Sequence, residues 1–213
     1  MTNPVLSGGF LMFFFRKYIG MFRRVLTAVL FIVTVESLAQ ESLKNRELMF
    51  EKQIRESASD HGVDPLLIKA IIFTESSFFP NKTGSAGEVG LMQIRTVAAA
   101  DWAKEKAVPA PSKEDMFDPG LNIEIGTWYI ARALKRWYDN PDFLRLALAE
   151  YNAGRTRLLQ WMEHFQDDTD RLLAEKPVGK YTEKVCRKYI EYTMEKVSWE
   201  FPQETHPALV KYP

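Results

Sequence analysis

Glu75 is the residue of this chain whose surroundings best suit proton transfer. Leu67, Ile71 and Glu75 recur every four residues, so all three lie on one face of a predicted helix. Apolar surroundings and the negative end of a helix dipole both disfavour a carboxylate, so both raise its pKa. Cleavage of a glycosidic bond needs an acid that is still protonated near neutral pH. From periodicity alone, however, an exposed glutamate at a fraying helix end would be the better interpretation.

The elements around Glu75 are a helix and a glycine-rich loop. Asp64-Pro65 is a typical helix start, with a capping side chain followed by proline, and Pro80 is expected to end the helix. Residues 81–90 contain three glycines and predict a loop, which could hold a small hairpin. Its backbone is free to approach a sugar closely.

The rest of the chain also has helical patterns. Helices are expected over about 91–104, from Asp118-Pro119 to Trp137, from Pro141 to Gly154, over 158–165 and over 181–196. We find no convincing alternating strand pattern. The sequence therefore predicts a mostly α-helical domain.

Three sequence blocks, in order, add a family resemblance. They are Glu75-Ser76-Ser77-Phe78 with Gly90-Leu91-Met92-Gln93-Ile94, then Asp118-Pro119 with Asn122-Ile123, Gly126 and Tyr129, then Ala147-Leu148-Ala149-Glu150-Tyr151-Asn152-Ala153-Gly154 with Arg157 and Trp161. Together they resemble the soluble lytic transglycosylase family over about Val63 to Tyr192. The resemblance implies a single lysozyme-like domain with a cleft, and it implies that Glu75 is catalytic.

The same resemblance implies a set of substrate contacts. Gln93, Tyr151 and Asn152 are expected to face the glycan or to steady the catalytic acid, and the expected binding set also includes Ser85, Gly90, Met92 and Tyr181. Tyr151 is almost as compatible with core packing, and Met92 fits the core better than a ligand contact.

The chain departs from the family pattern at three places. Gly84 stands where many members have serine, Arg95-Thr96 replaces Met-Pro, and only Tyr181 remains of a C-terminal motif that here begins at Pro177. Several secondary substrate contacts are therefore open. Arg95 either binds a peptide-stem carboxylate or is simply solvated, and solvation is slightly favoured.

The family mechanism needs a single carboxylate. By resemblance, Glu75 protonates the oxygen between MurNAc and GlcNAc and then removes the proton of the MurNAc C6 hydroxyl, which closes a 1,6-anhydro ring. Two alternatives remain open. Glu88 or Glu150 could position a water for hydrolysis as in lysozyme, although each fits a structural or exposed role better. The protein could also be a non-catalytic peptidoglycan-binding module.

Composition limits the other partners. Lys plus Arg and Asp plus Glu each number 28, so no strong field points to nucleic acid. The three histidines lack metal-ligand spacing, and we predict neither a metal nor a cofactor. A monomer acting on peptidoglycan glycan strands is expected, with any cell-wall or secretion-complex protein partner unknown. The single cysteine, Cys186, excludes an intramolecular disulfide.

The N-terminus predicts export. Arg23 and Arg24 precede an apolar run, Val25 to Val35, and Ser37-Leu38-Ala39 is typical of a signal-peptidase site. The run looks too short to span a bilayer. We therefore predict a signal peptide at 1–39, with Met21 as a possible true start, and a periplasmic or cell-wall location. A helical lead-in at 40–62, a catalytic domain at 63–197 and an irregular tail at 198–213 complete the predicted organisation.

Overall fold

The structure is a computed structural model that describes the backbone of residues 8–200 and the side chains of Arg24 and residues 26–196. The chain divides into two compact units, residues 1–45 and residues 46–213. Residues 46–62, which the sequence assigned to a lead-in, pack within the second unit.

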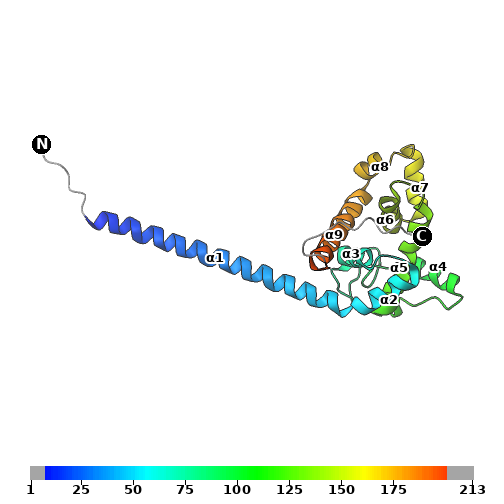
Figure 1. Ribbon diagram of the computed structural model, residues 1–213, viewed down its shortest axis with the longest axis horizontal. Coiled ribbons are helices and arrows are strands. Elements are labelled where there is room, and N and C mark those ends of the chain that lie inside the picture. The colour runs from blue at the N-terminus through cyan, green and yellow to red at the C-terminus, as the bar shows by residue number, and fades with distance from the viewer. Residues whose placement is uncertain (1–7, 201–213) are drawn as a thin grey trace. The chain divides into compact units, whose positions relative to one another are not determined.

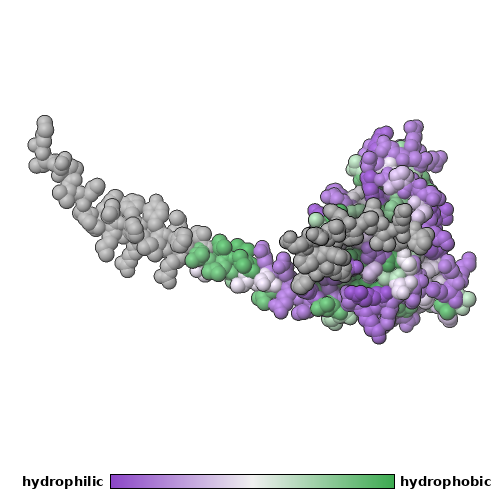
Figure 2. Space-filling model, viewed as in Figure 1, coloured by the Kyte–Doolittle hydropathy of each residue, from purple (hydrophilic) through white to green (hydrophobic). Residues whose placement is uncertain are grey.

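Helix α1, Gly8–Met49, dominates the first unit (Figure 1). Within it, the 24-residue stretch Leu26–Met49 contains an 18-residue window with a mean hydropathy of 1.4, and the stretch is long and apolar enough to cross a membrane. This stretch is longer than the run Val25 to Val35 that looked too short. Figure 2 shows a hydrophobic band on this part of the chain. Leu30 and Phe31, within the stretch, are exposed. A signal sequence near the N-terminus has the same properties, so length and composition do not separate a signal from an anchor.

The second unit is built from helices, which confirms the mostly α-helical prediction. Its elements are α2 (Glu51–His61), α3 (Pro65–Ser76), α4 (Thr96–Lys106), the short 3-10 helix η1 (Asp115–Phe117), α5 (Pro119–Trp137), α6 (Phe143–Ala153), α7 (Arg155–His164), α8 (Thr169–Glu175) and α9 (Pro177–Glu200). Among residues 8–200 the only extended pairing is two isolated antiparallel bridges, Thr83 with Val89 and Val89 with Ile94.

Helix α5 is the centre of the packing. It contacts α2, α4, α6 and η1, and its residues Ile123, Ile125 and Ile130 are completely buried. Helix α9 packs against α3 and α6, and the Tyr189 hydroxyl donates to the Asp64 carboxylate over 2.6 Å. Because Asp64 also caps α3 by accepting from the Leu66 amide, α9 is tied to the start of the helix that carries Glu75.

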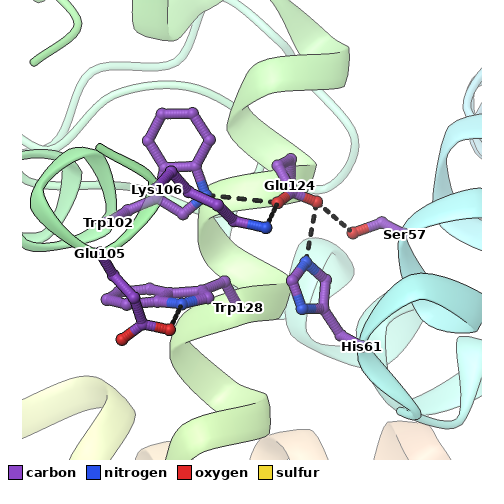
Figure 3. Close-up of polar contacts among 7 residues, drawn as sticks. All are labelled: Ser57, His61, Trp102, Glu105, Lys106, Glu124 and Trp128. Atoms are coloured by element: carbon purple, nitrogen blue, oxygen red, sulfur yellow. Dashed lines mark hydrogen bonds and ion pairs between the residues drawn. The ribbon is translucent and has the colours of Figure 1, made fainter. Parts of the chain in front are cut away.

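A partly buried carboxylate, Glu124 of α5, joins three helices (Figure 3). One oxygen lies 2.8 Å from His61 Nε2 and 3.5 Å from Ser57 Oγ on α2, and the other accepts from Trp102 Nε1 on α4 over 3.2 Å. Lys106 Nζ lies 3.4 Å away. Burial alone would raise the Glu124 pKa, but these hydrogen bonds and charges outweigh it, and the pKa lies below its ordinary value.

Several predicted boundaries were wrong. Helix α3 ends at Ser76, before Pro80, and α4 begins at Thr96 rather than near Leu91. Helix α6 begins two residues after Pro141, α9 begins at Pro177, and α8 had no predicted counterpart. Residues 198–200 continue α9 instead of starting a tail, and the predicted tail at 201–213 lies outside the described residues.

Candidate active site

The end of α3 fixes the position of Glu75. Ser77 and Phe78 both adopt left-handed backbone angles, with φ of 51° and 62°, so the helix stops immediately after Ser76. Such angles cost side-chain-bearing residues about 1 kcal/mol each. The Phe78 side chain is completely buried, and its burial offsets that cost. Glu75 consequently lies in the last turn of α3, as the sequence predicted.

The Glu75 carboxyl is mostly shielded from water, and this burial raises its pKa from 4.5 to about 7. The nearby Glu88 carboxylate pushes the pKa in the same direction. The Tyr181 hydroxyl and the charge of Lys82 lower it, but burial dominates. Near neutral pH, both the protonated and the ionised form of Glu75 are therefore accessible, so the group can both give and take a proton.

Two tyrosines from distant parts of the sequence lie near Glu75. Tyr151, on α6, and Tyr181, on α9, are close enough for the Glu75 charge to raise the pKa of each hydroxyl, after the larger effect of burial. The Tyr151 hydroxyl donates to the Met92 carbonyl over 2.8 Å. The buried Tyr181 hydroxyl faces Glu75, and no hydrogen bond of standard geometry reaches it from any described residue. The Tyr181 hydroxyl can therefore donate a hydrogen bond to the Glu75 carboxylate.

The loop after α3 is folded back onto Glu75. The Lys82 ammonium donates to the backbone carbonyl of Glu75. The Gln93 side-chain amide donates to the carbonyls of Lys82 and Gly90, over 3.1 Å and 2.8 Å. A Cβ at Gly84 would lie 2.3 Å from a Glu88 oxygen and 2.9 Å from Gln93 Oε1. The space that a side chain at position 84 would occupy is therefore filled by these two side chains.

Asn122 is the residue whose role sequence reasoning missed. Its completely buried side chain accepts from the Met92 amide over 2.8 Å and donates to the carbonyls of Val89 and Met116, over 3.0 Å and 2.8 Å. A Cβ at Gly90, whose φ is +81°, would lie 2.2 Å from the Asn122 amide nitrogen. The Asn122-Ile123 motif was visible in the sequence, but nothing in it indicated that α5 holds the loop through this amide.

The other predicted site residues divide into buried and exposed groups. Met92 is completely buried in the core, so its side chain has no surface to offer a glycan, while Ser85 and Asn152 are exposed. Glu150 is buried and paired with Arg136, and it accepts from Trp137 Nε1 over 2.8 Å. Its role is structural, the interpretation that the sequence favoured. Among the described residues, no three His, Cys, Asp or Glu side chains are grouped to hold a metal ion.

Comparison with known proteins identifies the family. The sequence model of the family described as "Transglycosylase SLT domain" matches residues 52–173, more than half of the chain. The chain belongs to this family. The match begins within α2 and ends within α8, so it includes Glu75, Gln93, Asn122 and Tyr151 but not Tyr181.

Two curated relatives are of the same kind. The chain is 34% identical over 128 residues to membrane-bound lytic murein transglycosylase E of Buchnera aphidicola, which covers 58% of this chain and 58% of the relative. It is 34% identical over 139 residues to membrane-bound lytic murein transglycosylase C of Klebsiella pneumoniae, which covers 62% of this chain and 38% of the relative. The chain thus spans less than two thirds of either relative.

A solved structure supports the fold. The 70 kDa soluble lytic transglycosylase of Escherichia coli superposes with a TM-score of 0.59 at 25% identity, over 68% of this chain and 24% of that protein. The predicted lysozyme-like, mostly α-helical fold is therefore confirmed for this SLT domain.

Replacing Asn122 by alanine tests how the loop is held. Three buried backbone groups would lose the Asn122 side chain as a partner, and of these the Val89 carbonyl would still accept from the Ile94 amide. We expect the free energy of unfolding to fall by about 3 kcal/mol in denaturant titrations. Asn81→Ala, at an exposed loop position, is the control and should change stability by less than about 0.5 kcal/mol. Equal stability of the two variants would contradict the assigned role of Asn122.

Proposed function

We propose that this protein is a peptidoglycan lytic transglycosylase in which Glu75 acts first as an acid and then as a base. The observation that carries the proposal is the Glu75 carboxyl, which burial keeps partly protonated at neutral pH beside two tyrosines. Membership of the SLT family supports the choice of substrate. The names of the two curated relatives, both lytic murein transglycosylases, support it as well.

In the first step, protonated Glu75 gives its proton to the oxygen between MurNAc and GlcNAc. The bond from MurNAc C1 to that oxygen breaks, and GlcNAc leaves with a new 4-hydroxyl. The N-acetyl group of MurNAc stabilises the positive charge at C1. Glu75 is left as a carboxylate, which the Tyr181 hydroxyl and the Lys82 ammonium both stabilise, because each lowers the pKa of Glu75.

In the second step, the Glu75 carboxylate removes the proton of the MurNAc C6 hydroxyl. The C6 oxygen bonds to C1 and closes the 1,6-anhydro ring, so Glu75 is protonated again and no water is consumed. The two opposing effects on the pKa of Glu75 suit these two steps. Burial favours the acid form, while Tyr181 and Lys82 favour the base form.

Hydrolysis of the same bond is the second candidate, and one observation favours it. Glu88 lies close enough to Glu75 for its charge to raise the Glu75 pKa, and its side chain is only partly buried. A carboxylate in such a place can activate a water, as in inverting glycosidases. In this structure, however, a Glu88 oxygen accepts from the Ala86 amide over 3.0 Å, so Glu88 also serves to shape the loop.

Peptidoglycan lies outside the cytoplasmic membrane, so the proposal requires export of residues 46–200. Residues 1–39 are proposed to direct that export, with cleavage after Ala39. The apolar stretch Leu26–Met49 would alternatively remain as an anchor. Both arrangements place the SLT domain against the cell wall, where we expect it to act as a monomer.

Product analysis tests the reaction. Purified peptidoglycan incubated with the protein should release fragments that end in 1,6-anhydroMurNAc, detected by mass spectrometry. Glu75→Gln cannot donate or accept the proton, and we expect release to fall at least a hundredfold. Glu88→Gln is the matched control, because it removes a neighbouring carboxylate but leaves the acid, and it should give the same anhydro products.

Other products would change the conclusion. Reducing-end fragments, one water heavier and lost in Glu88→Gln, would establish hydrolysis. Binding to the wall without any release by the unaltered protein would leave a binding module.

N-terminal sequencing of the protein from cells tests export. A mature chain that begins at Gln40 and leaves the cytoplasm is expected. Recovery of the chain from the membrane fraction with α1 intact would show that α1 is an anchor and not a cleaved signal. Recovery of the full chain from the cytoplasm alone would contradict the proposed site of action.

A further inference from the structure

A polar pocket of about 620 Å³ lies between α4, α5 and the turn from α6 to α7. Two tyrosine rings in contact link its lining to the surroundings of Glu75. Tyr129 lines the pocket and packs edge to face on Tyr151, with ring centroids 6.4 Å apart. Tyr151 in turn lies close enough to Glu75 for the Glu75 charge to raise the pKa of its hydroxyl. If a sugar is bound at Glu75, a group attached to that sugar would therefore lie close to the pocket.

Four arginines and two acids line this pocket, so positive charge is in excess. Arg136 is paired with Glu150, and Arg132 lies 3.5 Å from Glu105 and over the Trp128 ring. The other two, Arg155 and Arg157, are exposed. Among the side chains that the structure describes, neither has an ion pair. These two guanidinium groups are therefore available to bind an anionic ligand.

The backbone at this place adds to the charge. Arg155 and Arg157 belong to the first turn of α7, which has no acidic side chain, and Gly154 before it offers no side-chain cap. The first intrahelical bond there runs from the Leu158 amide to the Gly154 carbonyl, so the preceding amides are open to a ligand. Two cations at the positive end of a helix are unfavourable by themselves, and a bound anion would reverse that cost.

We propose that this pocket binds a carboxylate of the peptide stem of peptidoglycan, with Arg155 and Arg157 as its ligands. The inference rests on the proposed function, since the stem belongs to the same MurNAc unit whose bond faces Glu75. Three stem residues extend about 10 Å, enough to pass from the sugar over one or two side chains. Guanidinium groups suit carboxylates because they bind them with two parallel hydrogen bonds. Thr156 and Gln160, also in the lining, offer hydrogen bonds to peptide amides.

Binding measurements test the pocket without reference to catalysis. Calorimetry on the full chain in detergent would use the isolated stem tetrapeptide, the same peptide with every carboxylate amidated, and inorganic phosphate. The free peptide should bind at least tenfold more tightly than the amidated one, and the Arg155→Gln/Arg157→Gln double variant should lose that difference. The control Arg187→Gln removes another exposed arginine, on α9, and should keep the difference in affinity between the two peptides.

The inference is overturned if free and amidated peptides bind alike, or if the double variant keeps the difference. Phosphate binding without peptide binding would also overturn it, by assigning the pocket to a different anion.

A comparison of two substrates separates this inference from the proposed function. The protein should cleave stem-bearing peptidoglycan at least fivefold faster than glycan stripped of its stems by an amidase, and the ratio should fall to about one in the double variant. Equal rates with the unaltered protein would overturn the role of the pocket and leave the proposed function intact. If neither substrate is cleaved, the proposed function fails, and the calorimetry alone decides what the pocket binds.

Discussion

The partial burial of one carboxyl group is the constraint on which the rest of this site depends. A free glutamate would be ionised at neutral pH, and it could not protonate a glycosidic oxygen. In this protein, burial raises the Glu75 pKa to about 7, and the abrupt end of α3 after Ser76 holds the group in that position. A deeper position would also prevent the carboxylate from forming. Tyr181 and Lys82 limit the effect of burial, and both forms of Glu75 remain accessible.

Three other helices, α5, α6 and α9, contribute to this balance. Helix α5 holds the loop through Asn122, and that loop returns Lys82 to the end of α3. Helix α6 supplies Tyr151, whose hydrogen bond to the Met92 carbonyl also fixes this loop. Helix α9 supplies Tyr181 and is anchored to the start of α3. The acid is therefore positioned by packing between elements far apart in sequence, and substitutions distant from Glu75 are expected to change its pKa.

The sequence predicted those parts of the fold that depend on local patterns. Asp64-Pro65 and Asp118-Pro119 begin helices because capping and proline geometry act within a few residues. The end of α3 and the start of α4 were misplaced. The left-handed angles of Ser77, Phe78 and Gln93 depend on tertiary burial and hydrogen bonding, which leave no local pattern.

The site followed the same division. Glu75 was predicted as the acid because its type, its spacing and its neighbouring motif agreed. The structural role of Asn122 and the charge of Lys82 were not found, since both depend on residues about 30 and 7 positions away that only the fold brings together. The arginine-lined pocket was also missed, because its residues come from four helices, α4, α5, α6 and α7, and from Gly154 between the last two.

The most direct test of this account is an NMR titration of the Glu75 side-chain carboxyl carbon, assigned by the signal that disappears in Glu75→Gln. The account predicts a midpoint near pH 7 and a higher one in Tyr181→Phe, which lacks the hydroxyl that stabilises the carboxylate. A midpoint near 4.5, unchanged in Tyr181→Phe, would show an ordinary solvated glutamate and would contradict the central role of burial at the end of α3.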